Sequence, residues 1–394
     1  MFSALKEQPK DKILALMQMF KDDPRQQKID LGVGVYKNAH GNTPIMRAIK
    51  EAEKKLWDVQ DTKTYVGLVG DMDFSDVMVD LLLRDTLERG AIASAATPGG
   101  TGAVRQAFEL VKLANPNARI FVSEPTWPNH LSILKHVGLE ILNYRYFDGT
   151  TRSVDHAGMI EDIAQAKAGD IVLLHGCCHN PTGANLSLFQ WQQVIDSLLE
   201  TGATPMIDIA YQGFGDGLEE DAEPTRLVVK SVPECIIAAS CSKNFGIYRE
   251  RTGVLLLTVQ EQSIKGISQG NLAYLNRQNF SFPPDHGARL VTMILKDARL
   301  KSDWQNELEE VRISMLSLRR QLADALTKAS DSDRFRFLAD HRGMFSLLGT
   351  TSDKVDMLRE KHGIYMVDDS RINIAGLNAK TIPILANAII ECGI

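Results

Sequence analysis

A series of short apolar runs, each of strand length, constrains the fold of this chain more than any other feature. They span residues 119–123, 171–175, 205–211, 235–239 and 254–259. Helical stretches such as 188–199 separate most of them. Near-continuous apolar strands that alternate with helices predict a parallel sheet covered by helices on both faces.

In such a sheet, ligands bind beyond the carboxyl ends of the strands. The residues expected at this edge are an aromatic ring, an amide, a carboxylate, a phenol, a hydroxyl and an amine. They are Trp127, Asn180, Asp208, Tyr211, Ser240 and Lys243. One such residue alone is equally consistent with a buried strand that leaves the core into a solvated loop. Because several strands deliver them to one edge, we expect a ligand site there.

Lys243 and Asp208 indicate the chemistry of this site. A lysine amine is a nucleophile only when unprotonated, and burial beside Arg251 and a bound ring cation would lower its pKa. An unprotonated lysine forms a Schiff base with an aldehyde. Asp208 stands alone on an apolar strand, where a carboxylate is costly to bury unless it faces a cation. A protonated pyridine nitrogen is one such cation.

Three further residues suit the ring of the same ligand. Trp127 offers a flat face on which a ring can stack. Asn180 and Tyr211 can hydrogen-bond to a phenolate oxygen on that ring. An aldehyde, a pyridine and a phenolate on one ring describe pyridoxal.

A glycine-rich turn that contains Gly100 and Thr101 precedes a helix expected at 103–114. A helix N-terminus offers free N–H groups to an anion, and with Ser240 and Arg251 it would hold a phosphate. The turn matches neither the Walker pattern nor the dinucleotide fingerprint. Alone, its glycines equally suit a simple tight turn. Together with the ring residues, they predict pyridoxal 5'-phosphate (PLP) as the cofactor.

Four motifs resemble those of the class I aminotransferases, and more narrowly their aspartate/aromatic amino acid branch, with a bacterial aromatic-amino-acid aminotransferase as the best match. They lie at 180–183, 208–214, 240–246 and 370–376. The resemblance runs from about Asp11 to the C-terminus. It implies the α/β PLP-dependent transferase fold, fold type I. That fold has a large domain, with a mostly parallel seven-stranded sheet flanked by helices, and a smaller α/β domain.

The resemblance also implies a domain division and an assembly. The expected parts are an N-terminal arm at 1–10, a small domain at 11–43 and 311–394, and a large cofactor-binding domain at 44–310. The expected assembly is a homodimer with active sites at the subunit interface.

Carried over residue by residue, the resemblance implies roles at the cofactor. Lys243 would hold PLP covalently, Asp208 would bind its ring nitrogen, and Tyr211 with Asn180 would bind its ring oxygen. Lys243, Asp208 and Tyr211 are the expected catalytic residues. The other expected cofactor-binding residues are Trp127 on the ring, His130 behind Asp208, and Gly100, Thr101, Ser240, Arg251 and Tyr65 of the partner subunit at the phosphate.

The expected substrate-binding residues include two arginines. Arg371 would clamp the α-carboxylate, for which a planar guanidinium is better suited than lysine. Gly34, in a strand expected at 31–36, would close over the substrate, with Trp127 and Asn180 also in contact. Arg277 matches the arginine that reaches from the partner subunit to a dicarboxylate side chain.

Two positions depart from the strict aspartate pattern. Thr64 and Phe282 stand where that pattern usually has asparagines, which help to hold Arg277. A less tethered Arg277 could swing aside for an aromatic ring. We therefore expect an aminotransferase that acts on tyrosine and phenylalanine, and also on aspartate and glutamate, with 2-oxoglutarate as acceptor and ping-pong kinetics. The alternative is an aspartate aminotransferase with narrow dicarboxylate specificity.

Other classes on the same fold stay open. PLP lyases and decarboxylases are disfavoured by the joint presence of Arg277 and Arg371. A regulator that keeps the cofactor site as a sensor would carry a fused DNA-binding segment, and no basic helix-turn-helix region precedes Asp11.

Composition limits the partners. The net charge of -6 argues against nucleic acid, which requires a basic face, and no apolar run is long enough to span a bilayer. The five cysteines are an odd number with no CxxC spacing, as expected in the cytoplasm. Adjacent Cys177 and Cys178 are poorly placed to share one zinc site, so no metal site is expected.

Overall fold

The structure, a computed structural model, describes residues 1–8 and 11–394. Residues 9 and 10, the end of the expected N-terminal arm, lie outside the described residues. The chain divides into two compact units. The larger unit is Pro44–Ser314, and the smaller unit combines Met1–Thr43 with Met315–Ile394.

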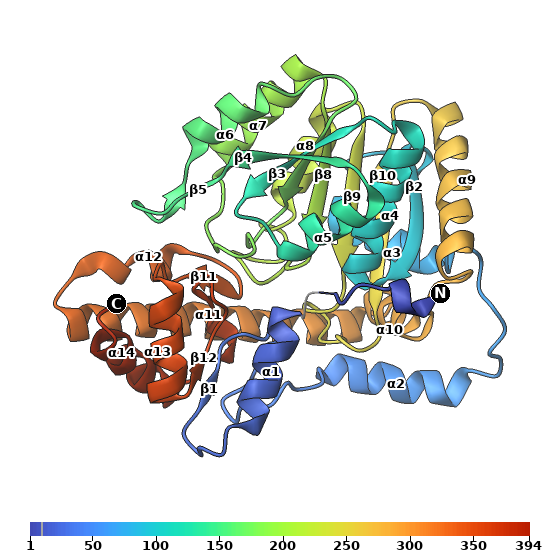
Figure 1. The fold of residues 1–394 in the computed structure, drawn as a ribbon. Coiled ribbons are helices and arrows are strands. Elements are labelled where there is room, and N and C mark those ends of the chain that lie inside the picture. Colours follow the sequence, from blue (N-terminus) through green and yellow to red (C-terminus); the bar gives the residue numbers. More distant parts are fainter. Residues whose placement is uncertain (9–10) are drawn as a thin grey trace. The chain divides into compact units, whose positions relative to one another are not determined.

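A seven-stranded sheet forms the centre of the larger unit (Figure 1). Its strands are β2 (Ile92–Pro98), β3 (Arg119–Glu124), β4 (Glu140–Arg145), β7 (Ile171–His175), β8 (Thr204–Ile209), β9 (Cys235–Ser240) and β10 (Thr252–Thr258). Their order is β2-β10-β9-β8-β7-β3-β4, and β10 is antiparallel to both of its neighbours while the other pairs are parallel. The mostly parallel seven-stranded sheet predicted above is therefore confirmed. A separate two-stranded ribbon joins β5 (Phe147–Asp148) to β6 (Ser153–Val154).

Helices cover both faces of this sheet (Figure 1). On one face lie α4 (Gly99–Ala114), α5 (Pro128–Val137) and α9 (Gln262–Asn279). The remaining helices of the larger unit are α2 (Arg47–Val59), α3 (Met72–Leu83), η2 (Arg89–Ala91), α6 (His156–Ile163), α7 (Leu188–Thr201), α8 (Glu223–Ser231) and α10 (His286–Lys296). Alanines on β2 and on α4, such as Ala95 and Ala107, share one buried cluster. Because their side chains are small, the helix backbone can lie close to the sheet.

The carboxyl ends of the parallel strands meet at one edge of the sheet. Thr252, the first residue of β10, pairs with Pro98, the last residue of β2. Ser240 at the end of β9 pairs with Gly253, and Asp208 near the end of β8 pairs with His175. The sheet register therefore brings residues from five strands to this edge.

The smaller unit contains short strands and helices. Its elements are η1 (Phe2–Ala4), α1 (Lys12–Asp22), β1 (Ile29–Asp30), η3 (Asp333–Phe335), α12 (Phe337–Asp340), β11 (Phe345–Leu347), α13 (Ser352–His362), β12 (Ile364–Tyr365), β13 (Arg371–Asn373), η4 (Ile374–Gly376) and α14 (Thr381–Glu391). The long helix α11 (Ala298–Ser330) contains the boundary between the two units. In the described part of the chain, no helix is long and apolar enough to cross a membrane.

The prediction of a strand at 31–36 is wrong. Only Ile29 and Asp30 pair in a strand, with β12, and residues 31–36 form none. Two side chains of β13 donate hydrogen bonds to backbone carbonyls of this segment. Arg371 donates to Gly32 O, and Asn373 donates to Val33 O and Val35 O. These side-chain hydrogen bonds replace those that a neighbouring strand would have made.

Candidate active site

Asp208 lies near the carboxyl end of β8 in a line of buried and partly buried polar groups. His130 Nε2 lies 2.8 Å from Asp208 Oδ2 and donates its proton, because a carboxylate only accepts. Thr126 Oγ1 bridges His130 Nδ1, at 3.0 Å, and His175 Nε2, at 3.2 Å. A continuous chain of hydrogen bonds thus runs from Asp208 to His175 at the end of β7.

Opposing effects set the charges of Asp208 and Lys243. Burial by itself raises the pKa of Asp208, but the hydrogen bond from His130 and the nearby cationic groups outweigh it, so this pKa lies below its ordinary value. Burial lowers the pKa of Lys243 to about 8, and Arg251 adds to the decrease although Asp208 opposes it. Asp208 is therefore a carboxylate ready to face a cation, and Lys243 can lose its proton close to neutral pH.

The expected ring-binding residues lie on three loops at the same edge of the sheet. Lys243 Nζ lies 4.8 Å from the ring centroid of Tyr211, which is buried just after β8. Asn180 is buried in the loop that follows β7. Trp127 immediately precedes α5, and its ring contacts that of His130 edge to face at 5.1 Å.

The N-terminus of α4 forms a cradle with β9 and β10. Gly99 has φ +71°, and a Cβ there would lie 2.6 Å from Arg251 Nη2. A Cβ on Gly100 would lie 2.9 Å from the Cβ of Ser240. Glycine is thus required for the close approach of Ser240 and Arg251 to the helix end, where the first N–H groups have no partner within the helix. Hydroxyl, guanidinium and free N–H groups in one cradle fit a phosphate ester.

Tyr65, Arg277 and Phe282 form a second group in the larger unit. The rings of Tyr65 and Phe282 are stacked, with centroids 4.6 Å apart and planes 15° apart. Arg277 Nη1 donates to Ser281 Oγ at 2.8 Å, and its Cζ lies 5.8 Å from the Phe282 ring. Tyr65 is 83% exposed, and Arg277 is exposed as well. Among the described residues, no recorded contact joins this group to Lys243 or Asp208.

Arg371 and Gly34 lie together in the smaller unit. Arg371 is buried on β13, donates to Gly32 O at 3.0 Å, and has its Cζ 4.3 Å from the centroid of the Phe345 ring. A Cβ on Gly34 would lie 2.9 Å from the same ring. Phe345 therefore holds the guanidinium plane on one side and the Gly34 backbone on another.

Sequence reasoning missed Thr126 and Phe345, and it assigned no role to His175 or His179. Thr126 lies one residue before Trp127, so its position beside a recognised residue was the available signal. His179 Nδ1 and Nε2 lie 2.9 Å and 3.0 Å from the hydroxyls of Thr182 and Ser123. Phe345 carries no local signal, because only the pairing of β11 with β13 brings it to Arg371.

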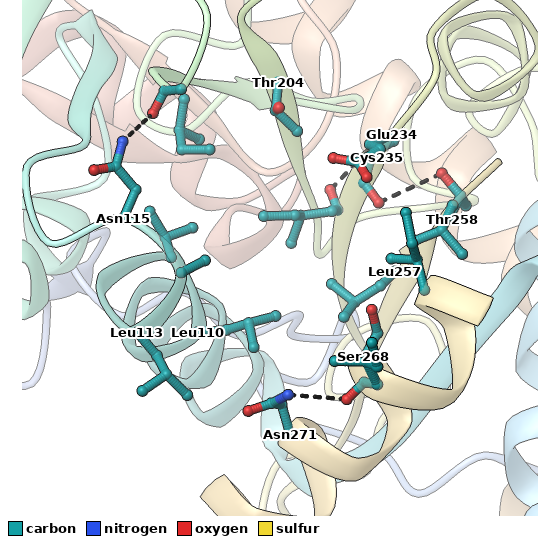
Figure 2. A pocket seen from close by; sticks show the side chains of 18 residues that line it. Leu110, Leu113, Asn115, Thr204, Glu234, Cys235, Leu257, Thr258, Ser268 and Asn271 are labelled. Carbon is teal, nitrogen blue, oxygen red and sulfur yellow. Dashed lines mark hydrogen bonds between the residues drawn. The ribbon is translucent and has the colours of Figure 1, made fainter. Parts of the chain in front are cut away.

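A cavity of about 470 Å³ lies away from this site (Figure 2). It is lined by the first residues of β7, β8 and β9 together with side chains of α4 and α9. It therefore occupies the amino-terminal edge of the parallel strands, opposite to the edge that carries Asp208 and Lys243.

The edge of this sheet carries a lysine of lowered pKa, a buried carboxylate held by a histidine, and a helix N-terminus that fits a phosphate ester. This arrangement is the one expected of a pyridoxal-phosphate-dependent enzyme of fold type I. The chain belongs to the family of class I and II aminotransferases, whose model matches residues 26–389. It is therefore an aminotransferase that uses PLP, as the sequence predicted.

Known proteins similar to this chain share its whole length. The aromatic-amino-acid aminotransferase of Paracoccus denitrificans is 59% identical over 394 residues, which is 100% of each chain. The structure of the Burkholderia pseudomallei aromatic-amino-acid aminotransferase, described as covalently bound to pyridoxal phosphate, has a TM-score of 0.97 at 36% identity and covers 99% of each chain. The psychrophilic aromatic amino acid aminotransferase of Psychrobacter sp. B6, cocrystallised with aspartic acid, has a TM-score of 0.96 at 33% identity. It covers 100% of this chain and 99% of that one.

Proposed function

We propose that this aminotransferase has dual specificity. Its amino donors are the aromatic amino acids tyrosine and phenylalanine, and also aspartate and glutamate, with 2-oxoglutarate as acceptor. The two half-reactions share one site and follow ping-pong kinetics.

The surroundings of Arg277 carry this proposal. Arg277 donates a hydrogen bond to the short hydroxyl side chain of Ser281, and its guanidinium lies beside the ring of Phe282. Asparagines at positions 64 and 282 would add amide groups that tether the arginine, and this chain has Thr64 and Phe282 instead. A weakly tethered guanidinium can pair with a dicarboxylate or move away from an aromatic ring, to which Phe282 adds apolar surface.

The similar proteins support the same substrates. The Paracoccus denitrificans relative is named for aromatic amino acids. The Psychrobacter structure bears an aromatic name and was obtained with aspartic acid. A protein that resembles both is a candidate for both classes of substrate.

The residues of the larger unit suit the cofactor as follows. When bound, PLP supplies an aldehyde that takes up the amino group and a ring that stabilises charge on the adjacent carbon. Asp208, held by His130, would pair with the protonated ring nitrogen, and Tyr211 with Asn180 would bind the ring oxygen. Trp127 would cover the ring. Gly100, Thr101, Ser240 and Arg251 would bind the phosphate, together with Tyr65 of the partner subunit.

Lys243 and Arg371 would act on the substrate. Once free, the neutral Nζ of Lys243 is the proposed base that takes the proton from the substrate α-carbon. Arg371 would bind the α-carboxylate with both arms of its guanidinium, since Gly32 O and Phe345 fix the orientation of the group. Gly34 would let the backbone close over the substrate.

The proposed assembly is a homodimer whose sites take Tyr65 and Arg277 of the partner subunit. Trp57, Val59 and Tyr65, which lie on or just after α2, are 85%, 71% and 83% exposed, and several large apolar side chains left exposed in one part of the chain support an interface there. We also propose that the two units are the small domain and the large cofactor-binding domain, and that the enzyme is cytoplasmic. All five cysteines are free, which supports a reducing compartment.

An absorption titration of the holoenzyme tests the substrate proposal. Phenylalanine and aspartate, added separately, should each convert the bound cofactor from its aldehyde form to its amine form. If aspartate alone converts it, the protein is an aspartate aminotransferase with narrow dicarboxylate specificity. Release of ammonia or carbon dioxide without an acceptor acid would instead indicate a lyase.

A further inference from the structure

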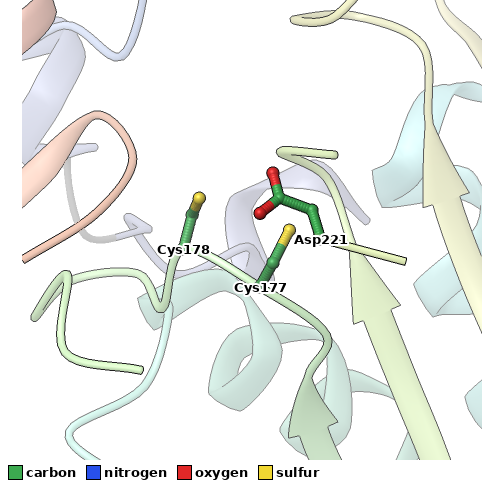
Figure 3. Close-up of side chains that lie close together, drawn as sticks. All are labelled: Cys177, Cys178 and Asp221. Carbon is green, nitrogen blue, oxygen red and sulfur yellow. The ribbon is translucent and has the colours of Figure 1, made fainter. Parts of the chain in front are cut away.

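Two adjacent thiols and a carboxylate meet in the larger unit, beside the loop segments that carry Asn180 and Tyr211. Cys177 and Cys178 lie in the loop after β7, and Asp221 lies in the turn before α8 (Figure 3). One donor atom from each lies within 4.8 Å of those of the other two. All three residues are buried, with exposed fractions of 7%, 2% and 4%.

The backbone explains why neighbouring cysteines come together here. From the sequence, no shared site is expected for these adjacent cysteines, and successive residues in an extended chain do point to opposite sides. Cys178 instead has φ +51°, in the left-handed region. This turn breaks the alternation and brings both sulfur atoms toward Asp221, which differs from the sequence-based expectation.

The carboxylate is oriented but keeps room for a ligand. Asp221 Oδ2 accepts hydrogen bonds from Gly213 N and Gly215 N, each at 2.8 Å, and Oδ1 accepts one from Asp216 N at 2.9 Å. An oxygen has two lone pairs, so Oδ1 can still bind a cation. Among the described residues, Asp221 forms no ion pair, and a buried carboxylate is costly without a cation.

A cavity gives an ion access to two of these donors, Cys177 and Asp221. It has a volume of about 300 Å³, and its lining includes Cys177, Asp221 and three further acidic residues, Asp216, Glu220 and Glu223. Carboxylates around a concave entrance raise the local concentration of cations. The cavity also holds space for water as a fourth ligand.

We propose that Cys177, Cys178 and Asp221 form a binding site for a thiophilic divalent cation of the Zn²⁺ type. Two sulfurs and one carboxylate oxygen are ligands that zinc accepts, and three protein ligands plus water complete a tetrahedron. Donors about 2.0–2.3 Å from one zinc ion lie roughly 3.5–4 Å apart, so small side-chain rotations close the site. Each thiol loses its proton on binding, and two protons are released for each ion bound.

The site adjoins the segment that carries Tyr211. Cys178 Sγ lies 4.0 Å from Tyr211 O, and Asp221 holds Gly213 N two residues further on. Drawing the donors together around an ion displaces this segment, and we infer that occupancy lowers the rate of transamination. This second part rests on the proposed role of Tyr211 in binding the cofactor.

Metal retention by the holoenzyme tests the binding site. Holoenzyme is incubated with one equivalent of Cd²⁺ or Zn²⁺, passed over a desalting column and analysed for metal, with proton release and Cd²⁺–thiolate absorption recorded in parallel. The wild type should retain one ion per chain, and Cys178→Ser and Asp221→Asn should weaken binding by at least about tenfold. Cys392→Ser, which alters a buried cysteine of the smaller unit, should bind as the wild type does.

The outcomes separate the binding site from the proposed function. No retained ion in the wild type, or equal retention in Cys178→Ser, overturns the site. Cofactor content, measured by the absorption of bound PLP, shows whether each variant is folded. If Asp221→Asn loses the cofactor, Cys178→Ser alone tests the binding site. If the wild type binds the metal but its rate of transamination is unchanged, the proposed inhibition is wrong and the binding site stands. Absence of any transamination in metal-free wild type refutes the proposed function and leaves the binding result standing.

Discussion

At the scale of single residues, electrostatics links Lys243 to Asp208 and Arg251. Asp208 favours the charged form of the lysine, whereas burial of the lysine away from water and the charge of Arg251 favour the neutral form. The neutral form prevails closer to neutral pH than in free lysine because burial is the largest of the three effects. A nucleophile prepared in this way carries a cost in stability before the cofactor arrives.

The cofactor-free protein should therefore gain stability as the pH rises. The pKa of Lys243 is lowered from 10.5 to about 8, so between these values the unfolded chain binds more protons than the folded one. Stability then rises with pH across this window, by about 3 kcal/mol at most. Urea unfolding of the cofactor-free protein at pH 7 and pH 10 measures this gain. The variant Lys243→Met should lack it, and parallel pH profiles for the two proteins would falsify the account.

The two arginines should divide substrate recognition between them. Arg371→Lys removes the two-armed contact to the α-carboxylate common to all substrates, so kcat/KM should fall roughly 10- to 100-fold for both phenylalanine and aspartate. Arg277→Lys should lower kcat/KM by a similar factor for aspartate and leave phenylalanine nearly unchanged. Steady-state kinetics with both donors measures the four ratios. An equal loss for both donors in Arg277→Lys would contradict its role at the side chain of the substrate.

At the scale of secondary structure, the junction of β2 with α4 forms the cradle proposed for the phosphate. The strand ends at Pro98 and the helix begins at Gly99 without a loop. Pairing of Thr252 with Pro98 then places Arg251 against the helix end. The sixteen-residue helix directs its unpaired N–H groups and the positive end of its dipole to this point.

A methyl group at Gly99 should damage this junction. Gly99→Ala forces a non-glycine residue to φ +71° and places its Cβ within 2.6 Å of the Arg251 guanidinium. We expect a cost of about 1–3 kcal/mol, roughly 5- to 150-fold in the Kd of PLP. Titration of cofactor-free protein with PLP measures it. Gly90→Ala is the matched control, since a Cβ there meets no atom within 4 Å, and comparable losses in both variants would show that the cradle is not the cause.

At the scale of the whole molecule, each unit carries part of the proposed site. The larger unit holds the residues proposed to bind PLP, and the smaller unit holds Arg371 and Gly34. Tyr65 and Arg277 are exposed, and their proposed roles require a second copy of the chain. The proposed site would therefore be complete only in an assembly of two copies.

Mixed dimers test whether the sites are shared. Lys243→Ala and Arg277→Ala should each have little activity toward aspartate, because each site lacks one essential group. A hybrid of the two has one site with both residues intact, so random mixing should restore about one quarter of the sites. Co-expression with two affinity tags, followed by assay with aspartate, measures the recovery. Isolated hybrids without activity would show that Arg277 serves the site of its own chain.

Much of the fold follows from local patterns in the sequence. The apolar runs that became β3, β7, β8, β9 and β10 were recognisable because strands buried on both faces need continuous apolar residues. The two strands that were not recognised, β2 and β4, are the edges of the sheet. The first is rich in alanine, a poor strand former, and half of the residues of the second are polar and exposed, so neither carries the pattern of a central strand.

The sequence by itself determined the kind of chemistry: a lysine, a carboxylate, a phosphate cradle and the edge of the sheet where they meet. Asp208 and Lys243 are readable because they lie at or just beyond the ends of recognisable strands, and the cradle is readable because its glycines directly precede a helical pattern. The tertiary structure alone decided which side chains support them. Thr126 joins His130 to His175, Phe345 packs on Arg371, and the turn at Cys178 directs two thiols to Asp221. Such contacts depend on strand register and on the φ angle of single residues, and neither leaves a pattern in the neighbouring sequence.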